Sequence, residues 1–181
     1  MIKIFIDQGH NPRNPNSGAE GNGLQEADLT YKIGVRVRDL LNSTPDFNCI
    51  TSRNSPGEIL GTGNASSLSA RTRAANEWGA DMFVSLHCNA SATGSEGYVY
   101  SLSSPAYAFS QSILKGLYNV TGTVSRGVFS RPTLYVLRKT AMPATLIEMG
   151  FITNPGEAAK MNNDPASYAQ GIYNGIVDFF K

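Results

Sequence analysis

The stretch Ile2-Lys3-Ile4-Phe5-Ile6-Asp7-Gln8-Gly9-His10 decides the fold. Residues 2–7 are rich in isoleucine and phenylalanine and begin with an apolar–polar alternation, which predicts a β-strand. A second apolar run, residues 82–86, ends in the same way, in Ser-Leu-His-Cys-Asn-Ala at residues 85–90. We therefore expect two strands, each followed at its carboxyl end by a histidine.

Outward from these two runs, segments with strand and helix patterns alternate along the chain. Apolar residues at helical spacing predict four helices, and short apolar runs predict four further strands. This order predicts an α/β fold: one domain, residues 1–181, with a twisted, mostly parallel sheet and helices on both faces. The helices are expected at residues 26–41, 69–78, 107–118 and 165–180, and the further strands at 47–52, 97–102, 134–137 and 144–149.

Composition narrows the class of protein. The 181 residues suit a single core, and a formal net charge of +1 with no basic face argues against a nucleic-acid partner. No window approaches the ~18 consecutive apolar residues that a membrane-spanning helix needs. Two cysteines, Cys49 and Cys88, are too few for a disulfide scaffold, so we expect buried, reduced thiols. Met1 leads directly into the first strand without a signal peptide, so we expect a protein without a standard export signal or a domain of a longer chain.

The chain holds only two histidines, His10 and His87, and both follow an apolar strand. A lone histidine in such a place is usually structural, but the carboxyl ends of parallel strands meet at one edge of a sheet, where sites gather. Two neutral imidazoles and one carboxylate make a zinc site with an open fourth position, which activates water. The nearby carboxylates are Glu20, Glu26 and Asp28. Glu26 opens a helix, but the preference of acidic residues for a first helical turn explains that placement equally well.

A further carboxylate, Glu148, lies in Thr-Leu-Ile-Glu-Met-Gly-Phe at residues 145–151. It ends an apolar strand, where an ionised carboxylate is costly unless it is paired or bound to a metal. One interpretation is a buried ion pair, and the other is a general base that faces the activated water. Together with the two histidines, it indicates metal-assisted hydrolysis of a substrate that these residues do not identify.

Several segments together resemble the N-acetylmuramoyl-L-alanine amidase family, which includes bacterial autolysins and phage endolysins. They extend over nearly the whole chain, and their order makes the resemblance specific. Two departures are Asn11 and Pro12, which follow the first histidine where the family often has glycine, and the loop 55–67, which is rich in small residues. No separate wall-binding module is visible. The segments are IFIDQGHNP, GNGLQEADLTYKIG, LSARTRAANEWGADMFVSLHCNAS, SRGV and LYVLRKTAMPATLIEMGFITNPGE, followed by the final helix.

The resemblance implies a role for each matching residue. His10, Glu26 and His87 would hold Zn²⁺, and Glu148 would be the catalytic glutamate. The substrate would be peptidoglycan, cut at the amide bond between N-acetylmuramic acid and L-alanine. The protein would act on the cell wall, either as a phage lysin that stays in the host cytoplasm until release or as a domain of a secreted autolysin.

Other residues and other functions remain as alternatives. Asn89 and Arg138 are candidate substrate contacts, with a loop hydrogen bond and an exposed charge as equally good interpretations. We expect helix-surface ion pairs at Arg71 and Arg73 and a core position for Trp78, and strand alternation should point Cys88 away from the histidines. A zinc carboxypeptidase acting on the stem peptide, or a wall-binding domain without activity, are the competing functions.

Overall fold

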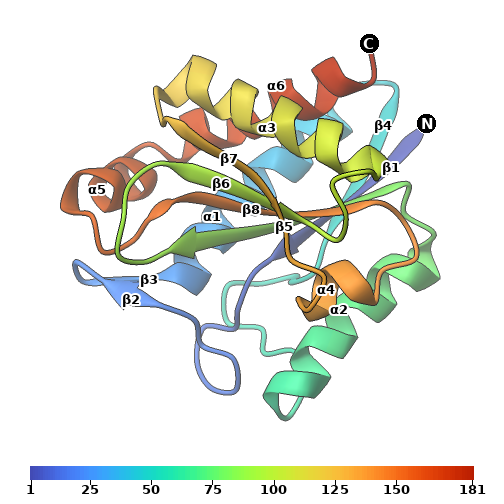
Figure 1. Cartoon of the computed structure of the whole chain (residues 1–181). Helices are drawn as coiled ribbons and strands as arrows, with labels where there is room; N and C mark the ends of the chain where they lie inside the picture. Colours follow the sequence, from blue (N-terminus) through green and yellow to red (C-terminus); the bar gives the residue numbers. More distant parts are fainter.

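A six-stranded sheet runs through the centre of the computed structural model, which describes residues 1–181 (Figure 1). The strand order is β4-β1-β5-β8-β6-β7. The first four strands are mutually parallel, β6 is antiparallel to β8, and β7 is parallel to β6. The expected mostly parallel sheet is therefore confirmed. The strands are β1 (Ile2–Gln8), β4 (Phe47–Thr51), β5 (Met82–Asn89), β6 (Ser95–Val99), β7 (Ser125–Ser130) and β8 (Ala144–Phe151), with a separate short hairpin of β2 (Glu20–Gly21) and β3 (Leu24–Gln25).

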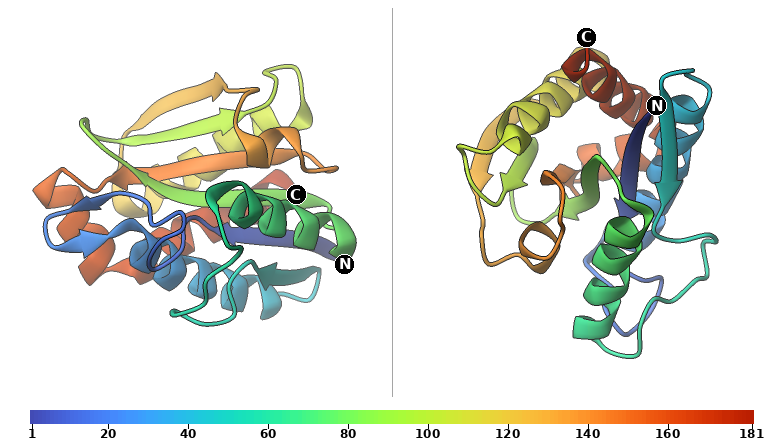
Figure 2. Two further views of the ribbon diagram at one scale, coloured as in Figure 1. Left: turned by 90° about the horizontal axis from the view of Figure 1, so that it is seen from below. Right: turned by 90° about the vertical axis from the view of Figure 1, so that its right-hand side faces the viewer.

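Helices cover both faces of the sheet, as the sequence predicts. Helices α1, α3 and α6 pack on one face, and α2 and α4 pack on the other. The right-hand view of Figure 2 shows α2 and α4 apart from α3 and α6, with strands of the sheet between them. No helix has the length and apolar character that crossing a membrane requires. The helices are α1 (Glu26–Asn42), α2 (Asn64–Trp78), α3 (Pro105–Thr121), α4 (Tyr135–Arg138), α5 (Pro155–Asn163) and α6 (Pro165–Phe179).

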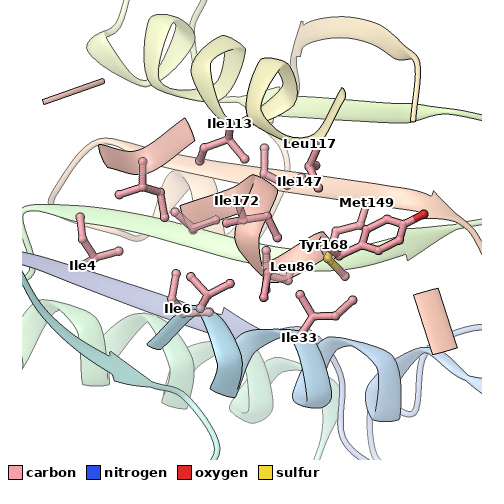
Figure 3. Close-up of a cluster of buried hydrophobic side chains, with 14 of the residues drawn as sticks. Ile4, Ile6, Ile33, Leu86, Ile113, Leu117, Ile147, Met149, Tyr168 and Ile172 are labelled. Atoms are coloured by element: carbon pink, nitrogen blue, oxygen red, sulfur yellow. The ribbon is translucent and has the colours of Figure 1, made fainter. Parts of the chain in front are cut away.

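Successive side chains of the central strands point to opposite faces of the sheet, so the interior consists of two hydrophobic clusters, one on each face. Ile4 and Ile6 of β1 point into the larger cluster, which α1, α3 and α6 cover (Figure 3). Phe5 points to the opposite face and stacks on Phe83, with the ring centroids 5.6 Å apart. Each such buried side chain contributes about 1.5–3 kcal/mol to folding. Because Cys88 lies in the larger cluster, its neighbour His87 must point to the opposite face, toward α2 and α4.

Helices α3 and α6 lie side by side (Figure 1) and approach so closely that glycine is required where they cross. A Cβ added to Gly116 would lie 2.2 Å from the carbonyl oxygen of Gly171, and one on Gly175 would lie 2.4 Å from the Cα of Ile113. Either distance is a steric clash between a side chain and backbone. The glycines therefore bring this helical layer close together above the apolar face of the sheet.

The structure corrects one expected element and adds others. Residues 134–137 do not form a strand, because Tyr135–Arg138 is the single helical turn α4, whose Val136 and Leu137 are buried in the smaller cluster. A short apolar run gives no period that separates a strand from a helix. Strand β7 and helix α5 were not expected, and α2 begins five residues before the predicted start. Trp78 is only partly buried, against the smaller cluster.

Candidate metal centre

Three of the predicted site residues meet at the carboxyl ends of β1 and β5. One ligand atom from each of His10, Glu26 and His87 lies within 4.8 Å of the other two. His10 Nε2 is 3.2 Å from Glu26 Oε2, and His87 Nδ1 is 3.0 Å from Glu26 Oε1. Of the other two carboxylates considered, Glu20 is exposed in β2 and Asp28 is exposed on α1, so neither joins this group.

The backbone holds the carboxylate of Glu26 in place. Glu26 is the first residue of α1 and is buried, with 3% of its surface exposed. Its Oε2 accepts a hydrogen bond from the amide of Ala19 at 2.8 Å, and its Oε1 accepts one from the amide of Cys88 at 2.9 Å. Burial raises the pKa of Glu26, but the two facing imidazoles outweigh that effect and hold the pKa well below its usual range. Glu26 is therefore an anion that two histidines face.

The orientation of His10 shows which of its nitrogens is available to a metal. His10 Nδ1 is 2.8 Å from Oδ1 of Asn16, and the side-chain nitrogen Nδ2 of Asn16 donates to Ser67 Oγ at 3.2 Å. Because an amide oxygen only accepts, Nδ1 is the protonated nitrogen. In the neutral ring, Nε2 then has the lone pair, which is directed at a carboxylate oxygen of Glu26. Two electron-rich atoms at 3.2 Å repel each other unless a proton or a cation lies between them, so this donor set fits a bound metal.

A buried arginine supports the strained backbone at His10. The residue has φ of 68°, a left-handed conformation that is costly for a side chain with a Cβ. The guanidinium of Arg71 donates to the His10 carbonyl oxygen at 2.8 Å and forms an ion pair with Asp7 at 2.8 Å. Arg71 is 1% exposed, so the prediction of a helix-surface ion pair is wrong for this residue. Arg73 is exposed on the outer side of α2.

Asp7 is the partner that keeps the Arg71 charge inside the protein. Burial raises the pKa of Asp7, but Arg71 and the hydroxyl of Ser85 more than offset it, so that the pKa lies below its usual range. Such a pair is expensive to break, because loss of one partner leaves the other charge buried alone, at about 3–5 kcal/mol. The sequence contains one sign of this buried ion pair, because Asp7 lies in an otherwise apolar strand, where a carboxylate needs a partner.

Glu148 lies beside the metal candidates on the same face of the sheet. Its position in β8 pairs with His87 of β5 on one side and with Glu96 of β6 on the other. Its Oε2 is buried and has no hydrogen-bond partner, and no cation forms an ion pair with it. Burial, and then the charges of Glu26 and Glu96, raise the pKa of Glu148 to about 8. The buried ion pair considered from the sequence is therefore absent, and this carboxyl group is free to take part in proton transfer.

Glu96 differs from Glu148 because its oxygens are fully engaged. Arg126 Nε donates to Oε1 at 2.7 Å, Asn89 Nδ2 donates to Oε2 at 3.2 Å, and the Tyr98 hydroxyl also donates to Oε2. The side chain of Asn89, a candidate substrate contact, therefore donates to Glu96 and does not point into an open cleft. Arg138, the other candidate substrate contact, is exposed at the end of α4. Sequence reasoning did not identify the Glu96 cluster, since its members lie on β5, β6 and β7 and share no spacing.

A small pocket of about 120 Å³ opens beside the two histidines. Its lining includes the charged side chains of Asp7 and Arg71 and apolar side chains from α2, from β8 and from the segment that begins α4. The apolar side chains are Leu68, Leu134, Val136 and Leu146.

Comparisons with known proteins agree with this geometry. The family model described as N-acetylmuramoyl-L-alanine amidase matches residues 4–178. The chain is 38% identical to the amidase CwlM of Bacillus licheniformis, over 100% of this chain and 70% of that protein. It is 38% identical to the sporulation-specific amidase of Bacillus subtilis, over 100% of this chain and 69% of that protein.

Solved structures of similar fold also belong to amidases. The N-acetylmuramoyl-L-alanine amidase of Clostridium difficile 630 superposes with a TM-score of 0.87 at 28% identity, covering 99% of this chain and 96% of that one. The CwlD amidase of Clostridioides difficile, solved in complex with the GerS lipoprotein, gives 0.89 at 25% identity, with 99% and 98% covered. The resemblance inferred from the sequence motifs is confirmed, and the chain belongs to the N-acetylmuramoyl-L-alanine amidase family.

Proposed function

We propose that this amidase depends on zinc held by His10, Glu26 and His87, and that Glu148 is its catalytic base. The bond cut is the amide between N-acetylmuramic acid and L-alanine of peptidoglycan. The observation that carries the proposal is the convergence of two imidazoles and one carboxylate within 4.8 Å, beside a carboxyl group with an unpartnered oxygen.

The donor set suits zinc in a catalytic site. Two histidines and one glutamate are a ligand combination that zinc hydrolases use, and three protein ligands leave a fourth position open. Glu26 is buried and anionic, and hydrogen bonds from backbone amides orient it, as expected for a ligating carboxylate. When bound, zinc supplies a Lewis acid that lowers the pKa of a water molecule and polarises the carbonyl of the substrate.

Glu148 moves the protons of the reaction. Its ionised carboxylate accepts a proton from the water that attacks the lactyl carbonyl carbon. It then gives this proton to the nitrogen of L-alanine as the carbon–nitrogen bond breaks, and a free carboxylic acid and a free amine result. An acid–base group works best when its pKa is near the working pH, and the pKa of Glu148 is raised to about 8 in the metal-free protein. General acid–base catalysis of this kind contributes about 10²–10⁴-fold in rate.

Relatives support a role at the bacterial cell wall. The chain is 33% identical to the endolysin of Bacillus phage SPP1, over 98% of this chain and 66% of that protein. It also spans only 35% of the LytC amidase of Bacillus subtilis, to which it is 34% identical. We therefore assign residues 1–181 as the catalytic domain, and this part of the proposal holds for a lysin and for an autolysin alike.

Two measurements test the proposal. The purified protein should contain about one zinc ion per chain, and a chelator should abolish lysis of cell walls. Full activity in protein whose metal content is measured as nil would refute the metal dependence.

Digestion of purified peptidoglycan, followed by mass spectrometry of the fragments, identifies the bond. An amidase frees the amino group of L-alanine and leaves the glycan strands intact. New reducing sugar ends would indicate a glycosidase. New amines only at other residues of the stem peptide would indicate a peptidase.

A further inference from the structure

A chain of buried hydrogen bonds leads from α2 to the far side of the His87 ring. Arg71 donates to Asp7 Oδ1 at 2.8 Å, the Ser85 hydroxyl donates to Asp7 Oδ2 at 2.7 Å, and Ser85 Oγ is 3.1 Å from His87 Nε2. Arg71 and Asp7 are each 1% exposed, and Ser85 is fully buried. Nothing in the proposed proton transfer uses these groups.

The direction of these hydrogen bonds is fixed at the Asp7 end. Asp7 is ionised beside Arg71 and can only accept, so the single hydrogen of the Ser85 hydroxyl points to Asp7. Ser85 Oγ is then an acceptor toward His87, and it binds the ring when Nε2 carries the proton. A neutral ring with its proton on Nε2 has its lone pair on Nδ1, the nitrogen that lies 3.0 Å from Glu26.

The same guanidinium reaches the other histidine. Arg71 Nη2 donates to the carbonyl oxygen of His10 and to Oδ1 of Asn11, at 2.8 and 3.0 Å. One buried cation therefore contacts the backbone of one imidazole-bearing residue and, through Asp7 and Ser85, the ring of the other.

We propose that Ser85, Asp7 and Arg71 are positioning residues that make His87 bind the metal through Nδ1, by accepting the Nε2 proton. The proposal rests on the proposed zinc site but assigns residues that the site itself does not include. Partners of this kind orient a metal-bound imidazole and raise its basicity, and their loss typically costs 10–100-fold in metal affinity. A network that only filled the interior would leave metal affinity unchanged when the Ser85 hydroxyl is removed.

The test uses Ser85→Ala and a matched control. Ser95 is also a fully buried serine on a strand, but its hydroxyl has no hydrogen-bond partner, so Ser95→Ala removes the same group without touching the network. Zinc affinity is measured by competition with a chelator of known affinity. We expect Ser85→Ala to bind zinc about 10–100-fold more weakly and Ser95→Ala to bind it as the unchanged protein does.

Nitrogen NMR of histidine-labelled, zinc-loaded protein gives a second readout, because only two imidazoles contribute signals. In the unchanged protein, His87 should be bound through Nδ1 and should carry a slowly exchanging proton on Nε2. In Ser85→Ala that proton should exchange faster. A proton on Nδ1 of His87, or unchanged affinity and exchange in Ser85→Ala, would overturn the proposal. If the unchanged protein binds no zinc at all, the proposed function fails instead, so the two failures are distinguishable.

Discussion

Replacing Glu148 with glutamine should stabilise the metal-free protein and remove its activity. In the metal-free fold the carboxyl group has a buried oxygen without a partner and lies near two other carboxylates, so its ionised form is unfavourable. Glutamine has nearly the same shape but never ionises. The substitution therefore removes an electrostatic cost from the folded state together with the proposed proton-transferring group.

The size and the pH dependence of this gain follow from the raised pKa. Burial, Glu26 and Glu96 raise the pKa of Glu148 from 4.5 to about 8. At 1.36 kcal/mol for each pKa unit, the cost of ionising the folded protein is at most about 5 kcal/mol. The side chain is partly exposed, so water reduces this to a few kcal/mol. Between pH 4.5 and about 8 the folded protein keeps a proton that the unfolded chain has lost. The stability of the unchanged protein therefore falls as pH rises through this window.

Urea unfolding at a series of pH values, in the presence of a chelator, measures this difference. Glu148→Gln and the unchanged protein should be equally stable below pH 4.5, and the variant should be more stable by a few kcal/mol above about pH 8. A gain that does not depend on pH, or a variant that is less stable at pH 8, would refute the reasoning.

The activity of the same variant tests the mechanism separately. Zinc-loaded Glu148→Gln should keep its zinc and bind wall fragments, but lose at least ~100-fold in rate. Near-normal turnover would remove Glu148 from the mechanism and return attention to Glu20, Asp28 and Glu96.

Three further substitutions follow from the contacts described above. Glu26→Ala should lose zinc, whereas Glu20→Ala, in an exposed hairpin, should keep most zinc and activity; metal analysis after dialysis distinguishes them, and the opposite pattern would reverse the assignment. Gly9→Ala should weaken zinc binding, because its Cβ would lie 2.6 Å from the His87 ring; an unchanged zinc affinity would show that the ring can move freely. Gly175→Ala should lower stability by about 1–3 kcal/mol, because its Cβ would collide with the backbone of α3; thermal unfolding measures this, and an unchanged Tm would contradict the close crossing.

Much of the site could be predicted because two apolar runs end at histidines. The pairing of Gln8 with Leu86 in parallel β1 and β5 brings both strand ends to the same edge of the sheet. Residue patterns alone do not decide which of Glu20, Glu26 and Asp28 is the third candidate metal ligand, because all three lie in one polar segment. The structure favours Glu26 because the β2–β3 hairpin leaves Glu20 exposed, and because the backbone amides of Ala19 and Cys88 hold the Glu26 carboxylate.

What the sequence did not reveal depends on distant pairs. Arg71 lies on α2, where helical periodicity gives no sign that its partner is Asp7, 64 residues earlier. The sequence predicts a strand at residues 134–137 because Tyr and Val favour strands, but in the structure the neighbouring Val136 and Leu137 are both buried, as one helical turn allows and strand alternation does not. The motifs of the family identified the activity that these local patterns left unnamed.

The central position of β8 in the sheet has a consequence during synthesis of the chain, because the residues of the candidate site emerge in sequence order. Strand β8 is the last to be synthesised, yet it lies between β5 and β6 and joins β4-β1-β5 to β6-β7. A nascent chain that has emerged as far as Pro143 contains His10, Glu26 and His87, but it lacks Glu148 and the strand that unites the two halves of the sheet. Translation therefore provides the three proposed metal ligands before the proposed catalytic base, and a chain that has emerged only as far as Pro143 lacks the residue on which the proposed proton transfer depends.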